Sequence, residues 1–515
     1  MHINTLYLSS TSSLIDIEQG IKGLIMAVKE LTVLVACSLI ACATSDEFFT
    51  STDKISQLFG EEKFLLATFS LYIDAEEEIV KRMKRDLLLL QLGTYLDPVD
   101  PEEIKDPVAA LKLLIRLRAE WLSIEEYTQK SLYKDNVYQI LLEYAQIPQI
   151  EDLEGAALGL ISLQELYKLY PHNITKETSL NADEAYIVGL IAFRQNKFQH
   201  AFLWFLYSLD RLTEYSAITE KELLRYLSDS AYHFGSLPVA MYFGQRLLNL
   251  DPTNDEVKVL LNLYRLLRFQ RTSNPDIFTL NTQSSKYETL CRGEIDERTS
   301  KRQRALSCRY STGGGNPRLM YAPVKEEVEW DEPRIIRYHD IISDREIEIL
   351  KNISRPLLSR SETKGGVSKI RTSQSVFLKD DNTVVARVNQ RIADITGLSM
   401  KSAEGLHVQN YGIGGKYEPH YDEWDDENGR IATFLIYMSD VEIGGSTVFP
   451  KVGVSLKPKQ GSAVFWYNLR KNGNVDLNTE HAGCPVFRGN KWVANKWIHE
   501  FGQEFRRPCS LSYSE

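Results

Sequence analysis

The stretch YEPHYDEW, residues 417–424, places a histidine and an aspartate two residues apart, at His420 and Asp422. Its aromatic content is typical of a strand and not of a helix. Alternate side chains of a strand share a face, so the imidazole and the carboxylate are expected to point the same way. Two such ligands chelate a metal ion but hold it loosely, and a third ligand is therefore expected elsewhere in the chain.

His481, in NTEHAGCP, is the best candidate for the third ligand, because it lies near the start of another predicted strand pair. Two histidines and one carboxylate form a facial triad, which leaves three adjacent positions for a bidentate substrate and dioxygen. Iron(II) suits this set of nitrogen and oxygen ligands. Zinc hydrolysis with the same ligands is the alternative at this point.

A lysine in NKWVANKWIHE, residues 490–500, favours the iron interpretation. Strand alternation puts five side chains of this stretch on one face: Lys491, Val493, Asn495, Trp497 and His499. A buried lysine could pair with the distal carboxylate of a dicarboxylic acid cosubstrate, which a zinc hydrolase does not need. Taken singly, each of these residues is more often an ordinary surface or core residue, so the prediction rests on their combination.

The elements that position these residues are predicted from residue 334 onward. A strand at 335–339 is followed by helices at 343–353 and 384–397, and then by short β-rich stretches with Gly and Asn/Asp between them: 406–412, 430–440, 446–452, 462–470 and 490–500. Many short strands with regular turns indicate a sandwich or jelly-roll barrel, with the helices on one side. We therefore expect a catalytic domain at 334–515.

The region 46–150 is predicted to be helical. Apolar residues recur there at three-, four- and seven-residue steps: Ile55, Leu58, Leu65, Phe69, Tyr72, Ile79 and Met83. Long amphipathic helices need a partner surface, which either their own domain or a second copy of the chain could supply. We interpret this region as a helical assembly or dimerisation domain.

The region 151–270 resembles tetratricopeptide repeats, with small residues where helices cross and a helix closed by LLNLDP. It is rich in tyrosine: Tyr186, Tyr207, Tyr215, Tyr226, Tyr232 and Tyr242. An aromatic groove could bind a polyproline II peptide, and Tyr226 and Tyr232 are the candidates for that role. Tyrosines at helical spacing are more often half-buried packing residues, the interpretation that the sequence alone favours.

Residues 271–333 are polar and turn-rich, which predicts a linker. The basic run between Cys291 and Cys308 is expected to be solvated. At the other end of the chain, the stretch from Met26 reads as a signal peptide that ends near Ala43, so that residues 1–45 comprise an upstream segment and this signal. The mature chain is then expected to have no membrane span.

Cleavage near Ala43 leaves four cysteines, and an even number in a secretory protein suggests disulfides. Sequence order favours Cys291–Cys308 and Cys484–Cys509, although four cysteines allow three pairings. Sequons at Asn173 and Asn352 agree with an endoplasmic reticulum route. A composition of 43% hydrophobic and 25% charged residues is that of a globular protein, and a formal charge of −10 argues against nucleic-acid binding.

Long motifs in the same order make residues 291–515 similar to the collagen prolyl 4-hydroxylase α-subunit family: RIIRYHDIISD, NYGIGGKYEPHYD, RIATFLIYMSDVEIGGSTVFP, AVFWYNL, HAGCPV, GNKWVANKWIHE and GQEFRRPC. This resemblance implies a double-stranded β-helix, with iron(II) bound by His420, Asp422 and His481. It implies that Lys491 binds the C5 carboxylate of 2-oxoglutarate.

The resemblance also implies roles around that centre. His499 would assist cosubstrate binding and decarboxylation, Tyr411 and Thr433 would line the cosubstrate pocket unless they only pack in the core, and Trp497 would lie where the peptidyl proline enters. The implied reaction converts proline in X-Pro-Gly sequences to 4-hydroxyproline, with 2-oxoglutarate and O2 consumed, succinate and CO2 released, and L-ascorbate required.

The family resemblance further implies a protein disulfide isomerase β subunit, an α2β2 tetramer, and retention in the endoplasmic reticulum lumen through that partner, since the C-terminal SYSE is no retention signal. The chain departs from the family pattern in the short EWDDENG (423–429), in the short SETKGGVSKIRTSQS (361–375), and at Asp229, where another groove tyrosine is expected. A prolyl hydroxylase for a noncollagen peptide, or an idle peptide-binding subunit, therefore remains an alternative.

Overall fold

The computed structural model describes residues 48–73, 84, 87–88, 91, 103–130, 148–270, 274–280, 284–299, 307–363, 366–367, 371–422 and 428–511. The predicted signal peptide, the start at Met26 and the apolar residues Ile79 and Met83 lie outside these residues, as do the side chains of Phe69 and Tyr72. No helix among the described residues combines the length and the apolar character needed to cross a membrane.

The chain divides into two compact units, and all contacts reported below lie within the larger one, which takes in Asp46–Phe59, Asp97–Arg118 and Pro148–Glu515. Two short 3-10 turns, η1 (Phe48–Thr50) and η2 (Glu103–Lys105), precede the long helices α2 (Thr52–Ile73) and α4 (Pro107–Lys130). Ser51 caps α2, because its hydroxyl accepts from the Lys54 backbone N–H. Ile55, Leu58 and Leu65 are buried, as their spacing predicts.

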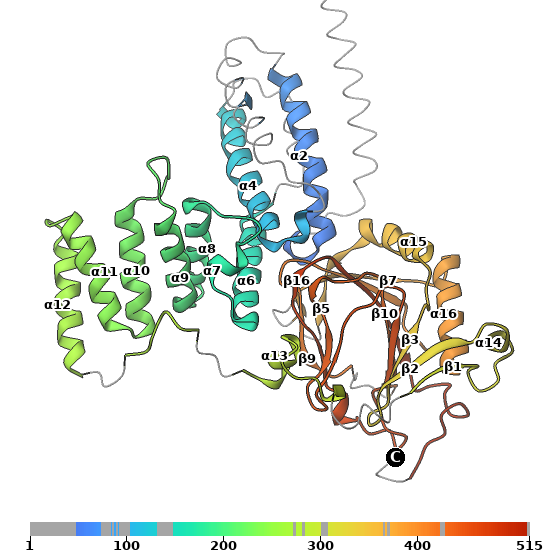
Figure 1. The fold of residues 1–515 in the computed structure, drawn as a ribbon. Helices are drawn as coiled ribbons and strands as arrows, with labels where there is room; N and C mark the ends of the chain where they lie inside the picture. The colour runs from blue at the N-terminus through green and yellow to red at the C-terminus, as the bar shows by residue number, and fades with distance from the viewer. Residues whose placement is uncertain are drawn as a thin grey trace, which may run out of the picture. The chain divides into compact units, whose positions relative to one another are not determined.

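Antiparallel helices form the repeat array that the sequence predicts (Figure 1): α6 (Ile150–Tyr167), α7 (Pro171–Ile174), α8 (Ala182–Arg194), α9 (Phe198–Asp210), α10 (Glu220–Phe234), α11 (Leu237–Leu250) and α12 (Asp255–Gln270). Capping boxes begin α8 at Asn181 and α10 at Thr219. Gly189 lets α8 approach α9 closely, since a Cβ there would lie 2.7 Å from the Phe205 ring. The tetratricopeptide-like prediction is confirmed.

Antiparallel strands form two main sheets in the C-terminal region. The larger sheet has the order β1-β2-β3-β14-β10-β17-β8-β7-β4, and a four-stranded sheet has the order β13-β12-β15-β9. The bounds of the larger sheet's strands are β1 Cys308–Ser311, β2 Val324–Trp330, β3 Ile335–His339, β4 Ser359–Arg360, β7 Gln374–Leu378, β8 Leu406–Tyr411, β10 Arg430–Tyr437, β14 Ala463–Tyr467 and β17 Lys491–His499.

The four-stranded sheet contains β9 Tyr417–His420, β12 Thr447–Phe449, β13 Val454–Leu456 and β15 His481–Gly483. Two short pairs complete the strands: β5 Glu362–Thr363 with β6 Gly366–Val367, and β11 Ile443–Gly444 with β16 Val486–Arg488. The remaining short elements are α13 Lys286–Cys291, η3 Glu297–Thr299, α14 Pro317–Tyr321, η5 Arg355–Leu357 and η6 Leu477–Thr479. Since β1 and β2 extend the sheet, strands occur within the segment that we predict as a linker.

The two faces of the larger sheet have different partners. Helices α15 (Asp344–Ser354) and α16 (Thr383–Thr396) cover one face over an aliphatic core (Figure 1). The opposite face packs on the four-stranded sheet through a second core that joins Leu435, Trp466 and Val493 to Phe449 and Leu456. Two sheets enclosing one interior confirm the predicted combination of a helical N-terminal half and a jelly-roll domain.

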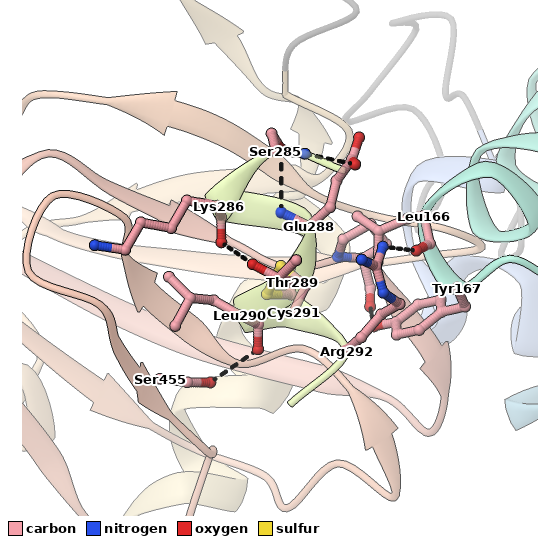
Figure 2. Close-up of a disulfide and its surroundings, with 12 residues drawn as sticks. Leu166, Tyr167, Ser285, Lys286, Glu288, Thr289, Leu290, Cys291, Arg292 and Ser455 are labelled. Carbon is pink, nitrogen blue, oxygen red and sulfur yellow. Dashed lines mark hydrogen bonds between the residues drawn. A yellow bond between two sulfur atoms is a disulfide. The ribbon is translucent and has the colours of Figure 1, made fainter. Parts of the chain in front are cut away.

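The predicted disulfides are wrong, because Cys291 pairs with Cys484, at a Cα–Cα distance of 5.5 Å. Figure 2 shows why: α13 lies on the barrel, with the Leu290 carbonyl accepting from Ser455 and the Arg292 guanidinium donating to the Leu166 carbonyl. Cys291 is thereby buried beside the residues that follow β15. Cys308, at the start of the edge strand β1, and Cys509 are exposed and free.

Replacing both Cys291 and Cys484 by serine should lower the free energy of unfolding by about 2–5 kcal/mol, because the disulfide closes a long loop. Urea denaturation measures this loss, and Cys308→Ser is the matched control, with an expected change of less than about 0.5 kcal/mol at an exposed position. A non-reducing peptide map that links Cys291 to Cys308 would contradict the observed pairing.

Candidate active site

The three predicted metal ligands lie together between two paired strands. His420 ends β9, Asp422 follows it, and His481 begins β15 directly opposite His420. The Asp422 carboxylate lies between the two imidazoles, with Oδ1 3.7 Å from His420 Nε2 and Oδ2 3.4 Å from His481 Nε2. One ligand atom from each residue falls within 4.8 Å of the others, which is the proximity that a shared metal ion requires.

Backbone carbonyls fix the orientation of both imidazoles. His420 Nδ1 lies 2.7 Å from the Glu418 carbonyl oxygen, and His481 Nδ1 lies 3.0 Å from the Thr479 carbonyl oxygen. Because a carbonyl can only accept, each Nδ1 carries the proton and each Nε2 keeps its lone pair for a metal. Burial also lowers the pKa of His481 to about 4, so this ring is neutral at physiological pH.

The Asp422 carboxylate is buried and oriented by a chain of side chains behind it. Thr433 Oγ1, on β10, donates to Asp422 Oδ2 at 2.7 Å, and Asn468 Nδ2 donates to Thr433 Oγ1 at 3.0 Å. Burial opposes ionisation of Asp422, but His481 and His420 outweigh it and hold its pKa well below the ordinary value. Thr433 is therefore a buried residue that also hydrogen-bonds the candidate ligand Asp422.

Aromatic rings pack against the two candidate histidine ligands. The Tyr417 ring stacks on His420 at a centroid distance of 3.5 Å, and Trp466 meets His481 edge-on at 4.8 Å. Phe449 lies 5.8 Å from His481. Two imidazole nitrogens and one carboxylate oxygen, with their free atoms converging, are the donor set that fits iron(II).

Lys491 supplies a buried cation beside this centre. It begins β17 opposite Tyr411, the last residue of β8, and its ammonium lies 4.9 Å from the centre of the Tyr411 ring. A Cβ on Gly483, two residues after His481, would lie 3.6 Å from Lys491 Nζ. Burial lowers the pKa of Lys491 to about 7, and no carboxylate of the described residues pairs with it. An unpaired buried cation is the feature that an incoming carboxylate would neutralise.

The remaining predicted residues divide into two groups. Tyr411 is buried beside Lys491, and its hydroxyl donates to Gln409 Oε1 at 2.9 Å. Trp497 pairs with Thr433 across the strands, and its buried indole N–H has no hydrogen-bond partner among the described residues. His499 instead contacts Glu404 at 3.0 Å, which raises its pKa, and the Asn428 carbonyl at 2.5 Å. No contact joins His499 to a ligand in the described structure.

Tyr226 and Tyr232 belong to the repeat array and not to this centre. Tyr226 stacks on Phe205 at 5.0 Å and meets Tyr186 edge-on at 5.7 Å, while Tyr232 stacks on Tyr264 at 4.9 Å. Both are half-buried between helices. This packing agrees with the interpretation that the sequence favours, and leaves their exposed edges available to a ligand.

Two residues of the pocket were missed at the level of sequence. Arg371 is 5% exposed, lies 5.0 Å from the centre of the Tyr417 ring, and has no partner for Nε and Nη2 among the described residues. His407 is buried and stacked on Phe377 at 4.1 Å, with its pKa well below the ordinary value because of burial. His407 is four residues from Tyr411 on the same strand face, and this spacing could have identified it from the sequence. The sequence around Arg371 contains no pattern that predicts its burial.

Comparison with known proteins finds a matching family model in each of the three regions. Residues 51–180 match the model of the prolyl 4-hydroxylase α-subunit N-terminal region, residues 182–268 match the prolyl 4-hydroxylase peptide-substrate-binding domain, and residues 406–499 match the 2OG-Fe(II) oxygenase superfamily. The last match runs from the start of β8 to the end of β17, and so includes every pocket residue on those strands.

Similar proteins extend over nearly the whole chain. Prolyl 4-hydroxylase subunit alpha-1 of Rattus norvegicus is 40% identical over 520 residues, which are 92% of this chain and 97% of the rat protein. The Homo sapiens subunit alpha-1 is 40% identical over 514 residues, 91% of this chain and 96% of the human protein. A solved viral collagen prolyl hydroxylase from Paramecium Bursaria Chlorella virus-1 is 27% identical, with a TM-score of 0.29, covering 32% of this chain and 95% of its own. The chain therefore belongs to the prolyl 4-hydroxylase α-subunit family, and its C-terminal half contains the family's iron(II)- and 2-oxoglutarate-dependent oxygenase domain.

Proposed function

We propose that the chain is the catalytic α subunit of a prolyl 4-hydroxylase that acts on peptidyl proline in X-Pro-Gly collagen-like sequences. The products are 4-hydroxyproline, succinate and CO2. One observation carries the proposal: the converging His420, Asp422 and His481 side chains lie beside the unpaired buried ammonium of Lys491. An idle peptide-binding subunit would not need a metal site and a cosubstrate cation that are both complete.

Each residue of the centre has a definite task. His420 and His481 offer Nε2 to iron(II), and Asp422 offers the carboxylate that Thr433 orients. Lys491 neutralises the distal carboxylate of 2-oxoglutarate and so fixes which end of the cosubstrate faces the metal. The bound iron, 2-oxoglutarate and O2 together supply the oxidising chemistry at proline C4. The surrounding aromatic rings exclude water from that chemistry.

The peptide is expected to enter beside Trp497. Its indole N–H and the Arg371 Nε and Nη2 are buried donors with no partner among the described residues, and a peptide carbonyl could accept from either side chain. The Arg430 guanidinium, 3.8 Å from the Trp497 ring centre, holds this ring in place. Glu404 in turn binds Arg430 through both carboxylate oxygens and His499 through one.

The repeat array supports a proline-rich peptide substrate, and Asp229 supports an alternative preference within that class. Asp229 lies on α10 between Tyr226 and Tyr232, is half-buried, and has its pKa raised by burial. Its nearest cation is Arg225, whose Nε lies 3.9 Å away. A carboxylate here in place of a tyrosine favours a noncollagen or otherwise distinct proline-containing peptide as the second candidate substrate.

We extend the proposal to assembly and location. The α subunit assembles with a protein disulfide isomerase β subunit as an α2β2 tetramer in the endoplasmic reticulum lumen, uses L-ascorbate, and loses a signal peptide. The Cys291–Cys484 disulfide suits an oxidising compartment. The sequon residues Asn173 and Asn352 are both exposed, as glycosylation requires.

The decisive test is succinate formation by the chain co-expressed with protein disulfide isomerase, with iron(II), 2-oxoglutarate and ascorbate. A (Pro-Pro-Gly) repeat peptide should stimulate turnover, and His420→Ala should abolish it. Non-collagen proline-containing peptides, run in parallel, separate the two candidate substrates. A folded, assembled complex without turnover on any of these peptides would refute the catalytic assignment.

The Lys491 ammonium should make cosubstrate binding depend on pH. Its pKa in the free enzyme is lowered to about 7, so the lysine is charged below that pH and increasingly neutral above it. Only the charged form pairs with the carboxylate, and the KM for 2-oxoglutarate should therefore rise above pH 7, by up to about tenfold per pH unit. Lys491→Arg should lose this dependence, because guanidinium stays charged. A KM that is flat from pH 6 to 8.5 in the wild type would contradict the assignment.

Thr433→Val should weaken metal binding by about 10–100-fold, because it removes the hydroxyl that orients Asp422 while keeping the side-chain shape. Manganese(II) binding, followed by electron paramagnetic resonance, measures the loss. The matched control is Thr447→Val, since Thr447 is equally buried but bonded to the Tyr437 hydroxyl at 2.8 Å. Equal metal affinities in the two variants would show that Thr433 only packs.

A further inference from the structure

Residues Phe48–Asp53, which we name the N-terminal clasp, are held by the oxygenase domain although the chain places them at its opposite end. Thr50 and Ser51 are fully buried. The Gly412 N–H donates to the Thr50 carbonyl at 2.9 Å, and the Ile413 N–H donates to the Phe49 carbonyl at 3.1 Å. The clasp therefore packs on the turn that directly follows β8, the strand that ends in Tyr411.

Glycine permits this close approach. A Cβ on Gly412 would overlap the Phe49 carbonyl and the Ser51 nitrogen, and a Cβ on Gly155 of α6 would overlap the Phe49 ring. The clasp is thus enclosed on one side by the turn after β8 and on the other by α6. Such close contacts with backbone atoms indicate that the clasp packs at one defined position.

The clasp also holds the two residues of β8 that precede the turn. Thr52 Oγ1 donates to the Tyr411 carbonyl at 3.1 Å. Asn410 Oδ1 accepts from the Asp53 N–H at 3.3 Å and from the Ser51 hydroxyl. The backbone of Tyr411, whose ring faces Lys491, is therefore bonded to the clasp directly.

Asp53 connects the clasp to the strand that carries Lys491. Its Oδ1 accepts from Asn490 Nδ2, and its Oδ2 pairs with Arg355 Nε at 2.9 Å. Asn490 Oδ1 in turn accepts from Asn410 Nδ2 at 2.6 Å, and the same amide donates to the Lys491 carbonyl at 3.3 Å. The end of β8 is thus hydrogen-bonded to the start of β17 through Asp53, Asn490 and Asn410.

We propose that the clasp sets the position of Lys491 and Tyr411, and that Asp53 is a positioning residue for the 2-oxoglutarate carboxylate. The proposal rests on the function proposed above, which assigns this carboxylate to Lys491. Asp53 touches no cosubstrate; it acts through Asn490 and Asn410. Strand ends open more readily than strand centres, so a lysine at the first position of β17 needs an anchor of this kind.

The test is calorimetric titration of 2-oxoglutarate into the full chain, co-expressed with protein disulfide isomerase and loaded with manganese(II). Asp53→Ala should raise the Kd for 2-oxoglutarate about tenfold, as expected for the loss of a hydrogen bond and a charge pair. The Kd for manganese(II) should stay within about twofold, because the three ligands lie on other strands. Gln57→Ala, at an exposed position one turn further along α2, is the control and should change neither value.

An exchange of partners distinguishes positioning from folding. Asn490→Asp alone places two carboxylates together and should weaken 2-oxoglutarate binding like Asp53→Ala. Combining Asp53→Asn with Asn490→Asp restores one amide and one carboxylate and should recover most of the affinity. Thr52→Val, which removes only the bond to the Tyr411 carbonyl, should raise the Kd by a smaller factor.

Three results separate the possible failures. Wild-type chain that binds manganese(II) but no 2-oxoglutarate refutes the proposed function itself. A second result refutes the clasp proposal alone: wild type binds 2-oxoglutarate, Lys491→Ala does not, and the Kd of Asp53→Ala for 2-oxoglutarate equals that of wild type. Loss of manganese(II) binding in Asp53→Ala, without recovery in the exchanged pair, also refutes it, because the clasp would then support folding and not the cosubstrate cation.

Discussion

An ammonium group buried without a counter-ion is the constraint on which the oxygenase domain depends. Removing a charge from water without compensation is costly, and the lowered pKa of Lys491 expresses that cost. The fold can keep such a group in place only if the strands around it are rigid. Central placement of β17 between β8 and β10 provides this rigidity, and the cores on both faces of the sheet prevent the lysine from turning out to solvent.

The metal ligands are stabilised by a different part of the molecule. His420 and His481 lie on a narrow strand pair, and that pair has its own support. Cys484, three residues after His481, is joined to Cys291 of α13, and the Tyr167 hydroxyl of α6 donates to the Pro485 carbonyl at 2.9 Å. The residues that follow β15 therefore contact both α6 and α13, which couples the stability of the ligand strand to the docking of these two helices.

A period of two residues predicts common faces for His420 with Asp422 and for Lys491 with Trp497, and the structure brings His420, Asp422 and His481 close together. The fold class followed from the change between helical and strand periodicity. Two features that distant packing decides were not predicted: Cys291 pairs across 193 residues, and Asp53 bonds to Asn490. Sequence order ranks nearby cysteines first, because it contains no information on which surfaces a helix such as α13 meets.

Buried polar atoms without partners occur beside the place where we propose that the peptide enters. In the described residues such atoms occur in both the helical region and the oxygenase domain, and within that domain they include Arg371 Nε and Nη2, the Trp497 indole nitrogen and the Asn495 side-chain oxygen. Each unpaired group lowers the stability of the free subunit, because it has lost its hydrogen bonds to water and has gained no partner in the protein. A peptide that supplies the missing acceptors and donors regains that free energy, whereas one that cannot leaves them unpaired. Under the proposed function, these unmade hydrogen bonds would contribute to the selection of the peptide at the oxygenase domain, in addition to selection by the repeat array.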